Sequence, residues 1–281
     1  MSEKTYPYFN YLLNQFKQSN SVIENSFGRH VHWGYWPQPE NAVCDDKDYA
    51  NAAEALTKQL VTTIKITDNQ SILDVGCGFG GTTAYLNEHY KNMQLTGVNI
   101  DERQLERARA IVQPQNNNQI TFQQADACNL PFHQPMFDNI LAVECIFHFP
   151  SREKFFKEVQ RTLKKNGSLV LSDFIPSKKF LLFTKPLTTK LYNKYSPFGE
   201  CQITHTIEMY QALAKKYHFK LIANDITKHT LPTYDFLLYL FNKVTPNHKR
   251  SFISKLVFKF MKWVAKKNHV TYQILKFEKV D

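Results

Sequence analysis

The sequence predicts an α/β fold, in which a mostly parallel sheet with an antiparallel last strand carries helical cap insertions. Two observations predict it. Apolar strand-like runs alternate with helix-like segments between residues 71 and 174, and such alternation is typical of a parallel sheet with helices on both faces. A glycine-rich turn follows the first of these runs, at the sheet edge where open α/β sheets bind their ligands.

The individual elements follow from hydrophobic periodicity. We expect strands at residues 71–75, 94–100, 120–124, 138–144 and 168–174, with helices at 82–90, 102–112 and 152–163. The run Lys164 to Gly167 (KKNG) follows the last of these helices, and basic residues closed by glycine are typical of a helix end. After residue 174 we expect a helix at 207–217, a strand at 219–227, a basic amphipathic helix at 251–267 and a last strand at 270–279.

A chain of 281 residues can bury one full core, which favours a single domain with a cap over two equal domains. We expect a helical cap over residues 1–60 and the main domain over residues 61–281, with lid insertions at about 175–205 and 230–268. The five cysteines have no paired spacing, so we expect reduced thiols. No apolar run is long enough to span a bilayer, and we expect a cytoplasmic protein.

The net charge of +10 is unevenly distributed along the chain. Residues 1–173 carry a net charge of −3, and residues 174–281 carry +13. Between Asp235 and Glu278, nine basic residues and no acidic residue are interleaved with apolar side chains. The basic charge therefore belongs to one surface rather than to the whole protein.

The glycine-rich turn runs from Asp74 to Thr82 (DVGCGFGGT), between a strand end and a helix start. Glycines permit positive φ angles and let a ligand approach the backbone closely. A bare GxGxG pattern is weak evidence, because NAD enzymes carry a related one. The spacing GxGxGG and the carboxylate of Asp74 argue against NAD, since an acid suits a ligand with an ammonium group and not a pyrophosphate.

The segment ILDVGCGFGG resembles the first motif of the class I S-adenosylmethionine-dependent methyltransferases, a family with a Rossmann-like sheet, and the resemblance extends from about residue 27 to the carboxyl terminus. It implies S-adenosyl-L-methionine as the cofactor. In that family the glycine turn holds the methionine part, residues at the second strand end hold the ribose, and residues at the third strand end frame the adenine. The matching residues here are Asp74, Gly76, Cys77 and Gly78 at the glycine turn, Asn99 and Gln104 for the ribose, and Asp126 and Ala127 for the adenine. We also expect Ile100, next to Asn99, to contact the cofactor.

Asn99 departs from the family pattern, because many members have an acidic residue there. An asparagine can still form a hydrogen bond with a hydroxyl group. Together with Gln104 it resembles one branch of the family. That branch contains sugar and natural-product O-methyltransferases, tocopherol methyltransferases and cyclopropane synthases.

Candidate catalytic residues follow the fourth and fifth strands. Methyl transfer is an in-line displacement, so the protein mainly positions the reactants, and an oxygen acceptor also loses a proton to a base. We expect His148 as this base and Asp173 as the carboxylate that orients it, a pair that resembles the His and Asp of small-molecule O-methyltransferases. Glu144 and His148 also resemble the Glu and His of cyclopropane synthases, and we expect Glu144 close to the cofactor. A purely structural alternative packs His148 between its neighbouring phenylalanines.

Residues 30–36 (HVHWGYW) combine aromatic side chains with two histidines, a density that is not expected on a free surface. The stretch resembles a segment of the small-molecule branch that folds over the methionine end of the cofactor. We therefore expect Tyr35 and Trp36 to face the sulfonium, because an aromatic face stabilises a cation. No carboxylate cluster accompanies His30 and His32 in sequence, and we expect no metal.

The sequence thus predicts an enzyme that transfers a methyl group to a small, hydrophobic or ring-bearing metabolite, with oxygen as the favoured acceptor. A C-methyltransferase or lipid-modifying enzyme with the same cofactor is one alternative, and an inactive cofactor-binding subunit is another. For residues 174–277 we favour a lid over a hydrophobic acceptor, then a transient membrane-surface contact through residues 251–267, and lastly nucleic-acid binding. We expect no nucleic-acid partner, and a monomer or a homodimer.

Overall fold

A computed structural model describes residues 7–184, 201–244 and 248–280 of the chain. For residue 244 and residues 248–254 it describes the backbone alone. Residues 185–200 of the first expected lid therefore lie outside the described residues, and so do the side chains at the start of the expected helix at 251–267.

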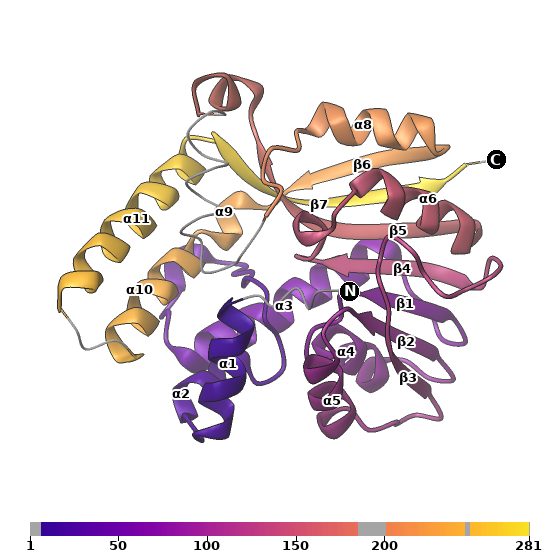
Figure 1. Ribbon diagram of the computed structural model, residues 1–281, viewed down its shortest axis with the longest axis horizontal. Helices are drawn as coiled ribbons and strands as arrows, with labels where there is room; N and C mark the ends of the chain where they lie inside the picture. Colours follow the sequence, from indigo (N-terminus) through magenta and orange to yellow (C-terminus); the bar gives the residue numbers. More distant parts are fainter. Residues whose placement is uncertain (1–6, 185–200, 245–247, 281) are drawn as a thin grey trace.

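Within the described residues, seven strands form one sheet in the order β3-β2-β1-β4-β5-β7-β6 (Figure 1). The first five strands, β1 to β5, pair with one another in parallel. Strand β7 lies between β5 and β6 and runs antiparallel to both. The predicted mostly parallel sheet with an antiparallel last strand is confirmed. The strands are β1 (Ser71–Val75), β2 (Gln94–Asn99), β3 (Gln119–Gln124), β4 (Phe137–Val143), β5 (Leu163–Pro176), β6 (Phe219–Asp225) and β7 (Val270–Lys279).

Helices cover both faces of the sheet because successive strand residues point to opposite faces, and in a parallel sheet both faces are buried. On one face Leu73 and Val75 join a core cluster with Phe155 and Phe156. On the other face Ile72 packs into a second cluster. The first face is covered by α6 (Arg152–Thr162) and α8 (Ile207–Lys216), and the second by α3 (Asp46–Ile64) and α4 (Gly81–His89), while α5 (Glu102–Ile111) packs on β2 and β3.

A helical layer lies beyond the carboxyl ends of the parallel strands, on the left in Figure 1. Its apolar side chains gather around Phe79 of the glycine turn, and they include Phe9, Ile23 and Phe236. This third cluster fixes the layer against the end of β1. The helices of this layer are α1 (Pro7–Lys17), α2 (Ser21–Phe27) and α10 (Pro232–Val244), with α11 (His248–Lys266) beside α10, α9 (Thr227–Thr230) and the short helix η1 (Pro39–Asn41). The short helix η2 (Ile146–His148) instead follows β4, and its Ile146 packs in the first core cluster.

The run Lys164–Gly167 does not end a helix, and this expectation is wrong. Helix α6 stops at Thr162, and the run belongs to the start of β5, where the pairing register with β4 shifts. A Cβ atom on Gly167 would lie 2.6 Å from the carbonyl oxygen of Asp138, so the glycine is needed for close strand contact. Lys164 forms an ion pair with the Asp138 carboxylate at 2.9 Å.

Helix α11 contains the expected basic amphipathic segment. Val264 and Ala265 are buried, whereas Leu256, Phe260 and Trp263 are exposed. Apolar side chains of α11 therefore face both inward and outward. No helix within the described part of the chain is both long and apolar enough to cross a membrane.

Candidate active site

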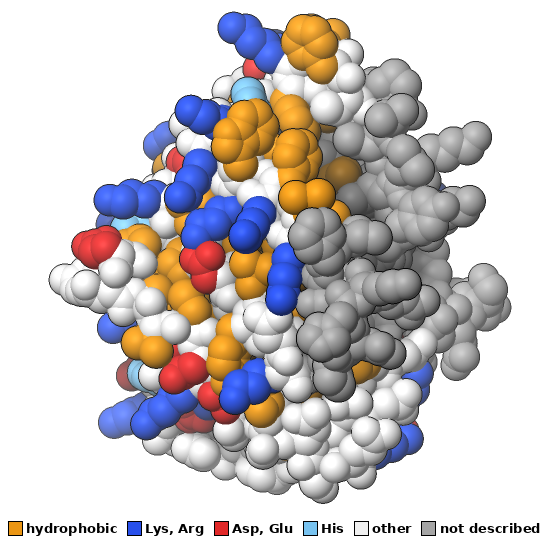
Figure 2. Space-filling model, turned by 90° about the vertical axis from the view of Figure 1, so that its left-hand side faces the viewer, with side chains coloured by type: hydrophobic (Ala, Val, Ile, Leu, Met, Phe, Trp, Pro, Cys, Tyr) orange, Lys and Arg blue, Asp and Glu red, His pale blue; other side chains and the backbone are white. Residues whose placement is uncertain are grey.

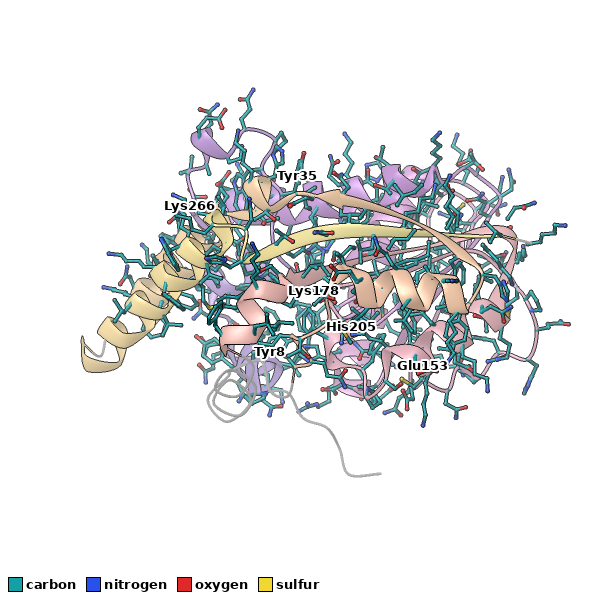
Figure 3. All side chains as sticks on the ribbon, turned by 90° about the horizontal axis from the view of Figure 1, so that it is seen from above. Tyr8, Tyr35, Glu153, Lys178, His205 and Lys266 are labelled. Atoms are coloured by element: carbon teal, nitrogen blue, oxygen red, sulfur yellow. The ribbon has the colours of Figure 1, made fainter. Side chains whose placement is uncertain are left out.

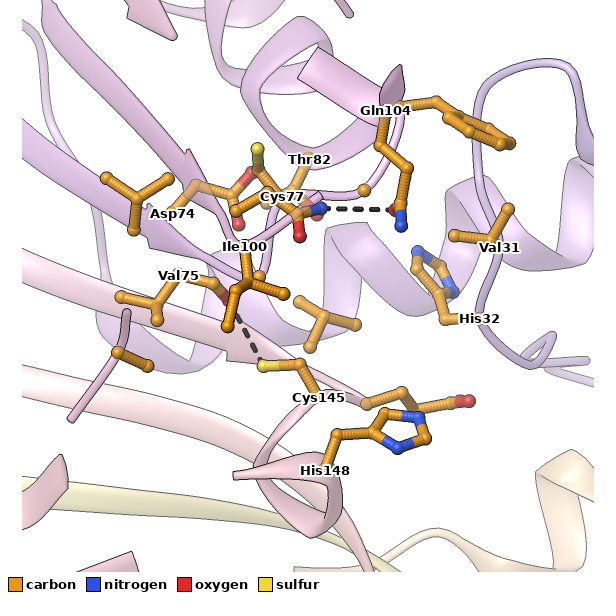
Figure 4. Close-up of a pocket in the computed structure, with 18 of the residues that line it drawn as sticks. Val31, His32, Asp74, Val75, Cys77, Thr82, Ile100, Gln104, Cys145 and His148 are labelled. Atoms are coloured by element: carbon orange, nitrogen blue, oxygen red, sulfur yellow. Dashed lines mark hydrogen bonds between the residues drawn. The ribbon is translucent and has the colours of Figure 1, made fainter. Parts of the chain in front are cut away.

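A cavity of about 350 Å³ opens beside the glycine turn, within the size range of small-molecule sites. The ends of β1, β2 and β4 contribute its walls, together with residues 29–32 and the start of α1. Figure 4 shows Asp74, Cys77 and Gln104 on one side of the cavity and His148 on the other. The predicted residues that line it are Asp74, Gly76, Cys77, Gly78, Asn99, Ile100, Gln104, Asp126, Ala127, Glu144 and His148.

The glycine turn has the backbone conformation that its glycines permit. Gly76, Gly78 and Gly80 have φ angles of +70°, +57° and +83°, a region that side chains with a Cβ rarely adopt. A Cβ on Gly76 would lie 2.6 Å from the Cβ of Cys145, whereas one on Gly78 would lie 3.1 Å from Val31 and 4.0 Å from Gln104. The first glycine permits close packing of β1 on β4, and the second leaves a ligand room at the cavity wall.

Asp74 is buried below the turn and accepts a hydrogen bond from the Thr83 hydroxyl at 2.9 Å. Burial raises the pKa of its carboxyl group to about 7, although Thr83 lowers it in part. An adjacent cation would favour the charged form of such a group. The carboxyl is thus placed to respond to a bound ammonium group.

Asn99 and Gln104 lie next to each other at the end of β2, which is what a joint contact with the ribose would need. The Asn99 side-chain amide donates to Oε1 of Gln104 at 3.1 Å, and both side chains are buried. Asn99 Oδ1 in turn accepts from the backbone N–H of Asp101 at 3.3 Å. These bonds fix two amide groups on the cavity wall, where their polar atoms suit hydroxyl groups.

Asp126 lies on the same wall beyond β3. Its Oδ1 accepts from the backbone N–H of Cys128 at 2.8 Å, which holds the carboxylate in place. Ala127 is buried beside it, and the side chain of Ile100 is partly exposed at the rim. A fixed acceptor beside these apolar side chains suits a purine with an exocyclic amino group. Together with the glycine turn and the two amides, these groups fit S-adenosylmethionine.

Glu144 follows β4 with a φ of +47°, an uncommon conformation for a residue with a side chain. Its Oε1 accepts from the backbone N–H of Trp33 at 2.7 Å and from the Tyr272 hydroxyl. Burial raises the pKa of the Glu144 carboxyl to about 8, against the lowering effect of these two donors. The residue therefore links residues 30–36, β4 and β7 at the cavity.

His148 ends η2 and is half-buried on the opposite wall. Its Nδ1 lies 3.6 Å from the buried Sγ of Cys201, and its ring stacks on Tyr8 with ring centres 6.3 Å apart. The structure therefore places His148 in the cavity that holds the glycine turn, between α1 and the segment after residue 200.

Asp173 is not the orienting partner of His148, and this expectation is wrong. Its buried carboxylate accepts from Arg152 at 2.9 Å and from the Tyr210 hydroxyl at 2.5 Å. Alternation along β5 explains the difference, because Leu171 and Ile175 face the α6 side and Asp173 points the same way. Among the described residues it does not line the cavity.

Tyr35 and Trp36 are also absent from the described lining of the cavity, so their predicted contact with the sulfonium is wrong. The Tyr35 ring stacks on His229 at 4.7 Å, and the Trp36 indole N–H donates to Asp48 at 2.9 Å. The backbone N–H of Tyr35 donates to the Ala52 carbonyl. These contacts fix Tyr35 and Trp36 against α3 and α9 rather than against the cavity.

The histidines of the same segment do reach the cavity. His30 Nε2 lies 2.6 Å from Glu54, and His32 Nε2 lies 3.0 Å from His30 Nδ1 and 3.2 Å from Thr57. Burial lowers the pKa of His32 to about 3. Within the described ranges no three His, Cys, Asp or Glu side chains are placed to hold a metal ion.

Some lining residues had no sequence signal of their own. Tyr8 and Phe9 reach the cavity from α1, whereas the sequence placed them only within the expected helical cap of residues 1–60. Tyr272 is outside the described lining, but its hydroxyl donates to the lining residue Glu144 from the last strand. Its position depends on β7 lying next to β5, which no local motif reveals.

Comparisons with known proteins show which family this chain resembles. The family described as "Methyltransferase domain" matches residues 73–171. The methyltransferase GfsG of Streptomyces halstedii is 29% identical over 233 residues, 82% of this chain and 81% of that protein. The 27-O-demethylrifamycin SV methyltransferase of Amycolatopsis mediterranei is 30% identical over 155 residues, 55% of this chain and 54% of that protein.

Solved structures show the same fold. The geranyl diphosphate C-methyltransferase from Streptomyces coelicolor A3(2) covers 100% of both chains with a TM-score of 0.72 and 15% identity. A structure described as a sarcosine dimethylglycine methyltransferase from Galdieria sulphuraria covers 94% of this chain and 99% of its own, with a TM-score of 0.71 and 16% identity.

Proposed function

Because the chain is a class I S-adenosylmethionine-dependent methyltransferase, we propose that it methylates a hydroxyl group on a hydrophobic or ring-bearing metabolite, with His148 as the base. One observation carries the proposal: His148 lines the same cavity as the glycine turn. A relative named 27-O-demethylrifamycin SV methyltransferase and another named O-methyltransferase support oxygen as the acceptor.

The bound cofactor supplies an electrophilic methyl group, and the chain supplies position. We assign the cofactor's amino group to Asp74, the ribose hydroxyls to Asn99 and Gln104, and the adenine amino group to Asp126. All four side chains line the cavity, and each already forms a hydrogen bond that restricts its orientation. Little reorganisation is then needed on binding, which favours both affinity and reactant alignment.

His148 would take the hydroxyl proton of the acceptor as the oxygen attacks. With Asp173 engaged by Arg152, orientation of the imidazole falls to Cys201 at Nδ1 and to the ring of Tyr8. The remaining wall around it is largely apolar, with Phe9, Val31 and Phe149. Such a wall favours an acceptor whose bulk is hydrophobic.

Carbon methylation is the second candidate, and Glu144 carries it. This carboxyl shares the cavity with His148, and burial raises its pKa to about 8. A carboxyl that keeps its proton near neutral pH is a hydrogen-bond donor rather than a base. It could orient an acceptor whose carbon atom attacks without prior loss of a hydroxyl proton.

The test is transfer of a labelled methyl group to a panel of hydrophobic hydroxylated compounds. His148→Ala is expected to lower kcat by about 10²–10⁴-fold and to leave the Kd for S-adenosylhomocysteine unchanged. The control is His133→Ala, because His133 is exposed in a loop away from the cavity. Full activity of His148→Ala would contradict the role of His148 and favour carbon methylation.

A further inference from the structure

Large hydrophobic side chains are exposed in one part of the molecule far more than elsewhere. Of the fourteen exposed large hydrophobic residues in the described ranges, six belong to α11 or to the helical residues 178–184. Leu256, Phe260 and Trp263 follow each other at intervals of four and three residues, which places them on one face of α11. The set comprises Leu182, Phe183, Leu256, Val257, Phe260 and Trp263, with Phe183 the most exposed at 88%.

Residues 178–184 and α11 lie side by side. The ring of Phe180 stacks on His269 with ring centres 5.6 Å apart, and His269 also contacts Trp263 at 5.7 Å. The backbone N–H of Ser177 donates to the His269 carbonyl at 2.8 Å. The exposed side chains of both segments thus form one surface, which we call the α11 face.

The α11 face is strongly basic. Lys259, Lys266 and Lys267 are exposed and form no ion pair with a described residue. Lys262 pairs with Asp235 and Lys178 with Glu208. Figure 2 shows Lys and Arg side chains next to hydrophobic ones on this side of the molecule.

We propose that the α11 face docks on an anionic lipid bilayer. A helix with exposed Phe, Trp and Leu beside lysines lies in the membrane interface, with its apolar side chains among the acyl chains and its lysines at anionic head groups. This proposal is independent of the acceptor assigned above.

A second copy of the chain fits the face less well, because a twofold contact would bring the same lysines together, and protein interfaces are depleted of lysine. Nucleic acid fits less well too. Bases can stack on Phe260 and Trp263, but nucleic acid offers no apolar environment for the exposed aliphatic side chains of Leu182, Leu256 and Val257.

The experiment is vesicle flotation with the full-length chain. Vesicles of phosphatidylcholine with an equal amount of phosphatidylglycerol are compared with vesicles of phosphatidylcholine alone. The protein is expected to float with the anionic vesicles only, and added salt is expected to weaken binding, because exposed charges are screened. Phe260→Gln/Trp263→Gln is expected to weaken binding by roughly tenfold or more.

Three further double variants separate the effect of charge from loss of the fold. Lys259→Gln/Lys266→Gln is expected to weaken binding by about fivefold per lysine. Ile111→Gln/Met136→Gln and Lys91→Gln/Lys157→Gln remove matched exposed residues elsewhere and are expected to float like the original protein. Lys157 lies on α6 with Glu153, which Figure 3 places at the opposite end of the molecule from Lys266.

All variants are first required to show the unfolding midpoint and the S-adenosylhomocysteine affinity of the original protein, so loss of the cofactor site is not mistaken for loss of the lipid site. The proposal is overturned if the original protein stays unbound, if it floats equally with neutral vesicles, or if the α11-face variants float normally. A dimer that these variants convert to a monomer, without vesicle binding, would instead assign the face to a contact between copies.

Discussion

Replacing Asp173 by asparagine is expected to destabilise the protein far more than it slows methyl transfer. Asp173 and Arg152 are 1% and 3% exposed, and their charged atoms are 2.9 Å apart. Asparagine keeps the shape, but its single oxygen can accept at only one of the two positions where the Asp173 carboxylate accepts, from the Tyr210 hydroxyl and from the backbone N–H of Phe174. It removes the charge and one acceptor, so the Arg152 guanidinium is left buried without its counter-ion.

Removal of one partner of a buried ion pair costs about 3–5 kcal/mol. Arg152 keeps hydrogen bonds to the Gln202 carbonyl and the Tyr210 hydroxyl, so we expect the lower end, about 3 kcal/mol. For a domain of this size, each kcal/mol lowers the melting temperature by roughly 2–4 °C. The variant is therefore expected to melt about 6–12 °C lower.

The assay combines urea unfolding with kcat measured on the folded fraction. Glu153→Gln, which breaks the exposed pair with Lys216, is the matched control and is expected to leave the midpoint unchanged. In Asp173→Asn/Arg152→Met the loss is expected to shrink, because no unpaired charge remains. A variant Asp173→Asn with normal stability but strongly reduced kcat would refute this reasoning and restore Asp173 as the orienting carboxylate.

Two further predictions concern the cavity. Burial raises the pKa of Glu144 from 4.5 to about 8, so the folded state holds this proton more tightly than the unfolded chain, and the free energy of unfolding falls as pH rises from 4.5 to about 8. Glu144→Gln is expected to flatten that fall in urea unfolding, while the exposed Glu106→Gln leaves it unchanged; equal slopes in all three proteins would contradict the assignment. Gly76→Ala combines a positive φ with a contact of 2.6 Å to Cys145 and is expected to cost about 2 kcal/mol or more. Gly78→Ala keeps the φ strain but meets Val31 only at 3.1 Å, so it is expected to cost less stability while weakening cofactor binding. Equal midpoints for the two alanine variants would show that the packing of β1 on β4 is not the reason for Gly76.

The sheet could be predicted from sequence because its strands are short apolar runs bounded by turns. The expected strand at 71–75 coincides with β1 (Ser71–Val75), and the expected helix at 152–163 with α6 (Arg152–Thr162). The predicted helix end at Lys164–Gly167 was wrong because the same short basic run followed by glycine suits both a helix end and an irregular strand start. Only the pairing of Leu163 with Phe137 decides between them.

The candidate site was predictable where residues directly follow the parallel strands. Asp74, Asn99, Asp126 and Glu144 meet because such strands end at one edge of the sheet. That rule says nothing about which face a side chain takes. The prediction that Asp173 orients His148 was therefore wrong, because the alternation of side chains along β5 places Asp173 on the α6 side of the sheet.

The predicted contact of Tyr35 and Trp36 with the sulfonium was wrong for a related reason. Their aromatic character indicated burial, and both rings do pack against protein. Aromatic character alone does not indicate which part of the protein the two rings pack against.

The most direct test of the account is titration calorimetry of S-adenosylhomocysteine into the purified chain and into Gly78→Val. The original protein is expected to bind and the variant is not, because a valine at φ +57° strains the turn and fills the cavity wall where a Cβ would lie 3.1 Å from Val31. No heat of binding to the original, folded protein would contradict the assignment of the cavity to this cofactor.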